Sequence, residues 1–176
     1  MAALRSISLV GTALVASTVL HQDISMANVT VGSPLEQLHL RRVLMKHQLP
    51  GGETVLEGCN LERTAVLTVS DDIWAKGFVA YVSLRIPDDQ VSCRGIGSSA
   101  APVADFAATT NQAVRLGDST ERIRQVYGNP IAKRVIGDRE MWTYDHGIVM
   151  TRPVSLVITL RGGRATKITL GMKPKR

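Results

Sequence analysis

The sequence predicts an α+β protein in which a short helix packs on an antiparallel sheet of three or four strands, preceded by a disulfide-tied antiparallel β region. Three observations favour this class. Stop signals at both ends bound a helix within residues 116–130. Segments with alternating apolar residues, separated by turn signals, lie on both sides of that helix. Two cysteines, Cys59 and Cys93, stand among the first group of these segments.

The first 27 residues have the organisation of a signal peptide. Arg5 gives a basic start, and the run from Ile7 to Leu20 carries no charge. A run of this length is shorter than the ~20 residues that cross a bilayer as a helix, and it suits the core of a leader. Ser25 and Ala27 have the small side chains that a signal peptidase reads, so we expect cleavage after Ala27. A buried helix or an uncleaved anchor is the alternative.

The composition is that of a folded globular protein with an excess of positive charge. Hydrophobic residues make up 44% of the chain and charged residues 20%, and the formal net charge is +6. For an exported basic protein we expect an envelope protein or an anionic envelope surface as partner, and no nucleic acid. The basic residues are dispersed, so an ordinary solvated surface is the alternative. No transmembrane segment is expected in the mature chain, and the oligomeric state stays open.

Residues 28–97 divide into an N-terminal helix and a β-meander. Ser33 can cap a helix that begins at Pro34, and Pro50 ends the run. The alternation within "LHLRRVLM" keeps a strand as the alternative. Four later segments have the pattern of strands: "ETVLEGCNL", "RTAVLTVS", "GFVAYVSLRI" and "QVSCRGIG".

In an exported chain, two cysteines are most simply explained by a disulfide, here Cys59–Cys93. On the chain-entropy model, closing a loop of this length stabilises the fold by roughly 3–4 kcal/mol. A catalytic thiol is the alternative, but no histidine lies between residues 48 and 145 to act as its base. The two cysteines are also too far apart, and lack paired histidines, to form a zinc site.

Residues 98–112 form a linker, and residues 113–176 a second domain that begins with the bounded helix. Gly117 precedes the helix, and Ser119 can accept hydrogen bonds from the orphan N–H groups of its first turn. Gly128 can end the helix in a left-handed conformation, and Pro130 prevents its continuation. Because so short a helix is unstable alone, we expect it to pack on the sheet that follows.

Hairpins follow the helix to the end of the chain. The first crosses Gly137-Asp138 and places Trp142 and Tyr144 on one face of a strand. The last consists of "VSLVITL" and "ATKITLG" on either side of "RGGR", a two-glycine turn. The helix and these strands predict the α+β arrangement of this domain.

A set of positions in residues 113–170 has a familiar spacing: Gly117, Gly128, Pro130, the Trp142-Thr143-Tyr144 triplet and the last hairpin. This pattern resembles the SmpA/OmlA domain, which occurs in the BamE subunit of the bacterial outer-membrane β-barrel assembly machinery. The resemblance implies a BamE-like domain of the cell envelope that binds a partner and has no chemistry of its own. Unlike that subunit, the chain has no cysteine just after its leader to carry a lipid, and it has a long additional segment before the domain.

We therefore predict a non-enzymatic cell-envelope module, periplasmic or secreted, that binds a partner or assists envelope assembly. The chain has no motif for a nucleophile, a carboxylate pair or a metal ligand set, so no catalytic residue, cofactor or metal site is expected. Trp142 and Tyr144 are the candidate binding surface. The alternative is an inhibitor that binds a partner enzyme through its sheet face and needs an exposed aromatic or acidic anchor there. A scaffold should instead show a basic or apolar patch.

Overall fold

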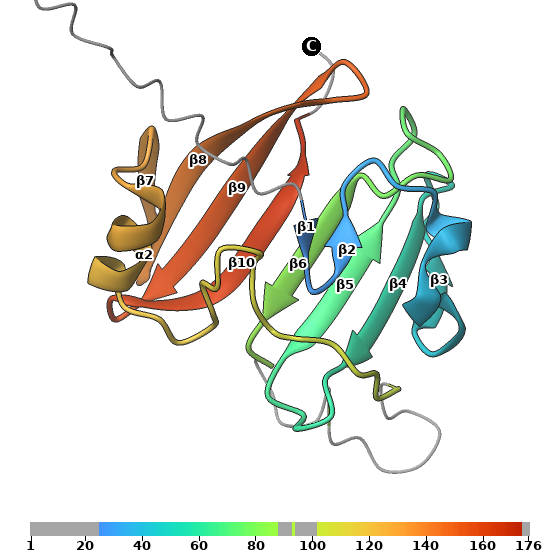
Figure 1. Cartoon of the computed structure of the whole chain (residues 1–176), viewed down its shortest axis with the longest axis horizontal. Helices are drawn as coiled ribbons and strands as arrows, with labels where there is room; N and C mark the ends of the chain where they lie inside the picture. Colours follow the sequence, from blue (N-terminus) through green and yellow to red (C-terminus); the bar gives the residue numbers. More distant parts are fainter. Residues whose placement is uncertain (1–24, 88–92, 94–101, 174–176) are drawn as a thin grey trace, which may run out of the picture.

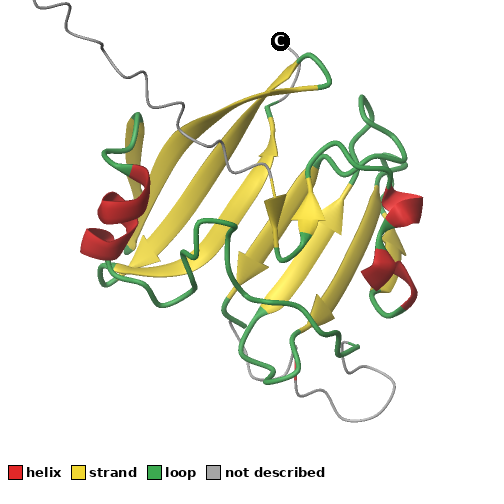
Figure 2. Ribbon diagram, in the orientation of Figure 1, coloured by secondary structure: helices red, strands yellow, loops and turns green. Residues whose placement is uncertain are grey.

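The computed structural model describes residues 25–87, 93 and 102–173. Within these residues the chain is mostly antiparallel β, with an eight-stranded sheet, a two-stranded sheet, two 3-10 helices and one short α-helix (Figures 1 and 2). The strands of the large sheet follow the order β3-β4-β5-β6-β10-β9-β8-β7. The expected antiparallel sheet with a short helix is therefore present, but its strands belong to a larger sheet than predicted.

The elements have the following bounds. The small sheet is β1 (Ser25–Met26) and β2 (Val29–Thr30), and the helices are η1 (Leu35–Gln37), η2 (His39–Arg42) and α2 (Thr120–Tyr127). The first half of the large sheet is β3 (Met45–Gln48), β4 (Thr54–Cys59), β5 (Val66–Ser70) and β6 (Tyr81–Arg85). The second half is β7 (Ala132–Ile136), β8 (Arg139–Val149), β9 (Arg152–Arg161) and β10 (Arg164–Met172).

The two halves of the sheet join through β6 and β10. These strands pair antiparallel from Lys167↔Arg85 to Gly171↔Tyr81. Strands from residues 28–97 and strands from residues 113–176 therefore share one continuous ladder of backbone hydrogen bonds.

A buried ion pair makes a second link between the halves. Arg152, at the start of β9, lies 2.7 Å from a carboxylate oxygen of Asp72, which follows β5. Arg152 also donates from Nε and Nη2 to the carbonyl of Lys173. The guanidinium is therefore satisfied on several sides, as a buried charge must be.

One side of the sheet is covered. Figures 1 and 2 show α2, the β1–β2 hairpin and the segment 102–119 in front of the strands. The side chains that point to this side form the core: Leu56, Leu67, Val69, Val82, Leu84, Trp142, Leu156, Ile158, Leu160, Ile168 and Leu170. Because side chains alternate along a strand, the residues between these point to the opposite side. We call that side the outer face; it carries Tyr81, Ser83, Arg85, Met141, Thr143, Val157, Thr159, Lys167 and Thr169.

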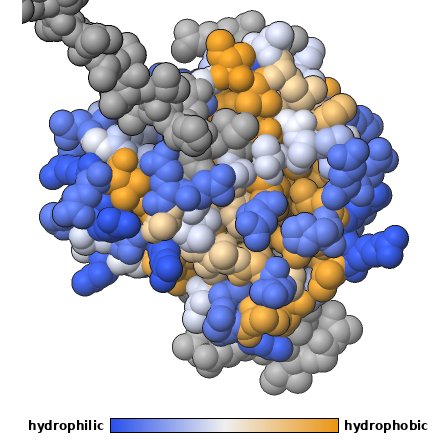
Figure 3. All heavy atoms as spheres, in the orientation of Figure 1, coloured by the Kyte–Doolittle hydropathy of each residue, from blue (hydrophilic) through white to orange (hydrophobic). Residues whose placement is uncertain are grey.

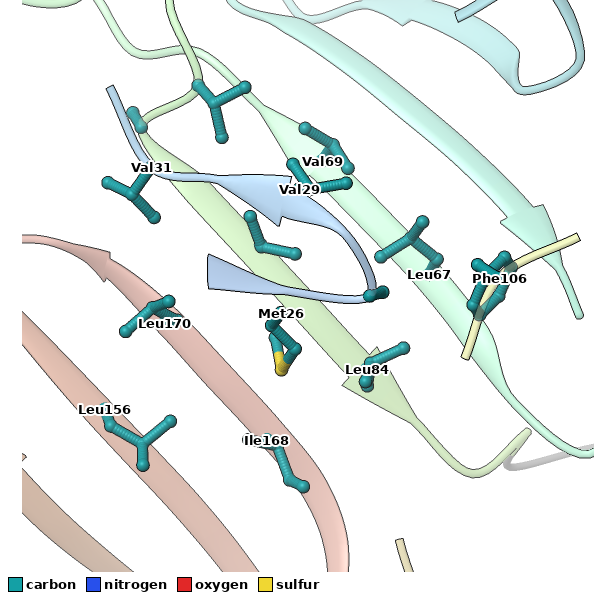
Figure 4. Close-up of a cluster of buried hydrophobic side chains, with 14 of the residues drawn as sticks. Met26, Val29, Val31, Leu67, Val69, Leu84, Phe106, Leu156, Ile168 and Leu170 are labelled. Carbon is teal, nitrogen blue, oxygen red and sulfur yellow. The ribbon is translucent and has the colours of Figure 1, made fainter. Parts of the chain in front are cut away.

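The β1–β2 hairpin packs over the β6–β10 junction. Its turn residues, Ala27 and Asn28, have φ values of +53° and +62°, typical of a two-residue type I′ turn. Met26 is fully buried and lies between Leu84 of β6 and Ile168 of β10 (Figure 4). The expected signal-peptidase site after Ala27 falls within this turn, whereas the rest of the expected leader, residues 1–24, lies outside the described residues.

The α-helix expected from Pro34 onward is absent, and this prediction is wrong. The Ser33 hydroxyl donates to the carbonyl of Thr30 and caps no helix. Two 3-10 helices, η1 and η2, bury Leu35 and Leu40 against the sheet instead. The chain then forms β3 at Met45–Gln48, where pairing with β4 satisfies its backbone groups. The strand alternative covered residues 38–45, and of these only Met45 lies in a strand, so it is not confirmed either.

The predicted disulfide is confirmed. Cys59 of β4 and Cys93 are bonded, with Cα atoms 5.8 Å apart. Both are buried with Val66 in a small cluster separate from the main core, on the outer face of β4 and β5. The predicted strand "QVSCRGIG" lies outside the described residues except for Cys93.

The second half of the expected linker is an extended arm on the sheet. Val103 forms a parallel bridge with Cys59, and Thr110 an antiparallel bridge with Met26. Phe106 between them is buried, with 6% of its surface exposed. The arm therefore contributes to the covering layer of the core.

Candidate functional site

The helix α2 begins and ends where the sequence predicts. Ser119 Oγ accepts a hydrogen bond from the N–H of Arg122 at 3.3 Å. The backbone N–H of Glu121, and then the side chains of Ser119 and Thr120, hold the pKa of the Glu121 carboxyl below its usual value. The negative charge at the positive end of the helix therefore stabilises its first turn.

Two glycines of the predicted motif have backbone angles that favour glycine. Gly117 has a φ of +87°, and its N–H donates to the carbonyl of Ala165 in β10. Gly128 ends α2 with a φ of +74° and a ψ of −153°. The positive φ agrees with the prediction, but the ψ lies far from that of a left-handed helical residue. Pro130 follows and leads the chain into β7.

Trp142 lies in the core beneath α2, with 1% of its surface exposed. Its indole N–H donates to Glu140 at 2.6 Å. The guanidinium of Arg124 on α2 and the ammonium of Lys133 on β7 lie 4.9 Å and 4.7 Å from its ring centroid. The tryptophan therefore joins helix, edge strand and sheet, and it presents no surface to a partner.

Tyr144 is buried as well, with 4% of its surface exposed. Its ring lies 5.4 Å from that of Tyr127 on α2. Burial raises the pKa of its phenol to about 12, and its hydroxyl has no hydrogen-bond partner among the described residues. The proposed binding surface of Trp142 and Tyr144 is thus corrected: both face the covered side because alternate residues of β8 point beneath α2.

The adjacent Asp145 and His146 point to opposite faces of β8. His146 is buried, and its ring meets that of Tyr127 edge-on at 5.6 Å. Asp145 is exposed and pairs with Lys173 at 2.6 Å. The carboxylate does not orient the imidazole, so the pair has no acid–base geometry.

A cleft of about 480 Å³ opens on the outer face where β6, β8, β9 and β10 meet. The residues that line it are Arg85, Ile86, Pro87, Ile136, Arg139, Met141, Thr159, Arg161, Thr166 and Lys167. Four of the lining residues are basic and none is acidic. We call this site the basic cleft. Sequence reasoning did not identify it.

The sheet register places these cations opposite one another. Lys167 of β10 pairs with Arg85 of β6, and Arg139 of β8 pairs with Arg161 of β9. Like charges directly opposite on neighbouring strands are destabilising. The fold therefore tolerates a repulsive arrangement at this place.

One cation of each pair is partly neutralised. Arg85 lies 3.4 Å from Glu57, and Arg161 lies 2.5 Å from Asp138. Arg139 and Lys167 have no ion pair within the part of the chain that the structure describes. Both are exposed, so the cleft retains two cations able to bind an anionic group.

The sequence contained part of the signal for the cleft. The predicted turns at Gly137-Asp138 and Gly162-Gly163 already imply that Arg139 and Arg161 lie at the same end of the sheet. The pairing of β6 with β10, which adds Arg85 beside Lys167, has no local sequence signal. Basic residues that are far apart in the sequence therefore come together in the cleft only through the pairing of distant strands.

No family model, curated protein or solved structure matches the chain. Within the described ranges, no helix combines the length and apolar character that a membrane span requires. The described residues also contain no group of three or more His, Cys, Asp or Glu side chains able to hold a metal ion.

Proposed function

We propose that the chain is a non-enzymatic binding module of the bacterial cell envelope that takes an acidic segment of a partner protein in the basic cleft. The observation that carries the proposal is the opposition of like charges in the sheet register. Such pairs reduce stability, so their presence at one cleft is best explained by a ligand that neutralises them. Arg139 and Lys167 are the residues that bind its carboxylates.

The cellular location is part of the proposal. The Cys59–Cys93 bond supports an oxidising compartment, and the leader-like residues 1–27 support export to the periplasm or secretion. The order of a capped helix, a Gly-x-Pro end, a Trp-x-Tyr strand and a final hairpin supports a BamE-like domain over residues 113–170. These features together favour a role in binding or assembly at the envelope.

The inhibitor remains the second candidate because the outer face is an open sheet surface. It carries Tyr81, which is half-buried and pairs with Gly171 across the strands. An inhibitor needs an aromatic or acidic anchor that is well exposed, since a few such residues dominate most interfaces. The charged residues of this face form the basic cleft and not an acidic anchor, which favours the binding module over the inhibitor.

The test compares two doubly substituted proteins with the same change in charge. Arg139→Gln/Lys167→Gln removes the free cations of the cleft, and Lys46→Gln/Arg122→Gln removes two exposed cations elsewhere. The probe is the peptide Thr-Glu-Val-Glu-Val-Glu-Thr, titrated against each protein by fluorescence anisotropy. Losing two charge-assisted contacts should weaken binding to the first variant by roughly tenfold or more. Equal weakening in both variants, or in neither, would contradict the proposal.

A further inference from the structure

We propose that the edge strand β7 receives a ninth strand, an extended segment of a partner protein in which acidic residues alternate with apolar ones. This inference rests on the proposed function, because the added strand would place acidic side chains beside Arg134 and towards Arg139, at the near rim of the basic cleft. Lys167 lies on β10, four strand spacings from the added strand, and would bind another part of the same partner. Figure 1 shows β7 at the end of the large sheet.

The outer edge of β7 carries backbone groups that no described strand pairs with. β7 is the last strand in the sheet order and pairs only with β8 among the described strands. Ile136↔Arg139 closes the two-residue turn of the hairpin, so Ile136 bonds towards β8. By the antiparallel alternation, the N–H and C=O of Val135 point away from β8. A partner strand can therefore bond to β7 without disturbing the β7–β8 ladder.

The two faces of β7 differ in chemistry. Val135 points to the side of Trp142 and is 71% exposed, and Ile131, just before β7, is 62% exposed. Arg134 and Ile136 point to the outer face, where Ile136 lines the basic cleft. Large apolar side chains with this exposure on a sheet edge favour association with another strand.

Charge decides against a second copy of the chain as the occupant. Two β7 strands side by side would bring Lys133 and Arg134 against the same cations, which is unfavourable. The side of the molecule that carries α2 and β7 is also mostly hydrophilic (Figure 3). A strand with acidic side chains on the outer face meets complementary charge at Arg134, so the edge favours that partner over a second copy of itself.

The period of a strand then predicts the sequence pattern of the partner. Side chains on the outer face should be acidic, because they lie beside Arg134 and near Arg139. Side chains on the other face should be apolar, because they lie beside Val135 and beside Lys133, whose charge is already directed to the Trp142 ring. Alternation of Glu or Asp with Val, Ile or Leu satisfies both faces at once.

The experiment separates strand addition from simple charge binding. The probe is again Thr-Glu-Val-Glu-Val-Glu-Thr, together with two twins of equal charge, one N-methylated at its valines and the other at its glutamates. N-methylation removes strand donors from one peptide edge and leaves the protein unchanged. We expect the twin that is blocked on the bonding edge to bind roughly tenfold weaker or worse. Val135→Pro should weaken the parent peptide similarly while the circular dichroism of the protein is retained.

The remaining outcomes each have a defined meaning. If both twins bind as tightly as the parent, and the Arg139→Gln/Lys167→Gln protein loses all three, strand addition is overturned and the proposed function stands. If the parent peptide does not bind the unaltered protein, both proposals are overturned. A concentration-dependent dimer that Val135→Pro disrupts would show that β7 pairs with itself, which also overturns the inference.

Discussion

Trp142 holds the C-terminal half together through contacts with three elements. It lies under α2, receives Arg124 and Lys133 on its ring, and donates to Glu140. Cation–π contacts of this kind add about 0.5–2 kcal/mol each to the effect of burial. The residue is therefore structural, and the same is true of the cap Ser119.

Substitutions at these two positions should differ in size. Trp142→Ala should lower the free energy of unfolding by roughly 3–5 kcal/mol, because burial is lost and a cavity remains. Ser119→Ala should cost only about 1 kcal/mol, since it removes one cap hydrogen bond. Denaturant unfolding monitored by circular dichroism measures both. Loss of peptide binding in Trp142→Ala with no change in stability would refute the structural role.

The raised pKa of Tyr144 predicts that the free energy of unfolding falls at alkaline pH. Its folded-state pKa of about 12 lies above the ordinary value of 10.0, so the folded protein holds the phenolic proton more tightly. The corresponding stability is complete below pH 10 and is lost as the pH rises towards 12. Tyr144→Phe should remove this loss. It should also stabilise the protein by about 1 kcal/mol at neutral pH, because an unsatisfied buried hydroxyl disappears.

Unfolding curves of both proteins at several pH values between neutral and alkaline check this prediction. Phenolate absorbance gives an independent value for the pKa of Tyr144. Parallel losses of stability with pH in the two proteins would show that another group causes the alkaline effect.

At the scale of elements, the β1–β2 hairpin closes the core over the β6–β10 junction. A chain that begins at Asn28 lacks the buried Met26 and the hydrogen bond from Ala27 to the carbonyl of Thr109. We expect it to be less stable than a chain that begins at Ser25 by about 2 kcal/mol or more, the usual cost of removing a buried side chain of this size. Thermal unfolding of the two chains compares them, and equal stability would show that the hairpin is dispensable.

The disulfide stabilises the other end of the sheet. Cys59 and Cys93 are separated by 34 residues, and both are buried beside Val66. Reduction should lower the free energy of unfolding by roughly 3–4 kcal/mol on the chain-entropy model. Unfolding with and without reductant measures the effect, with a Cys59→Ala/Cys93→Ala protein as the control that reductant should not change. Two thiols that react readily in the oxidised native protein would contradict the bond.

At the scale of the whole molecule, local signals predicted local structure well. The bounds of α2 follow from Ser119 and Gly128, and the last hairpin follows from its two-glycine turn. The disulfide follows from the presence of two cysteines in a chain with a leader-like start. Each of these depends on residues close in sequence or on the pairing of two unique side chains.

The remainder depends on contacts between distant segments. The pairing of β6 with β10 makes one sheet of both halves and assembles the basic cleft, yet neither strand carries a local sign of its partner. The same is true of Met26, whose burial requires two strands from different halves. The expected helix is likewise replaced by two 3-10 helices and by β3, whose pairing with β4 no local pattern indicated.

The central claim is that the opposed cations of the basic cleft lower the free energy of unfolding and bind an acidic partner. Denaturant unfolding of Arg139→Gln/Lys167→Gln at low and high salt tests it most directly, with Lys46→Gln/Arg122→Gln as the charge-matched control. Relief of two opposed like-charge pairs should raise the free energy of unfolding by about 0.5–1 kcal/mol at low salt, and screening should shrink this gain at high salt. The same protein should bind the acidic peptide poorly. A cleft variant that is less stable than the unaltered protein, or no more stabilised than the control, and that still binds the peptide would contradict the account.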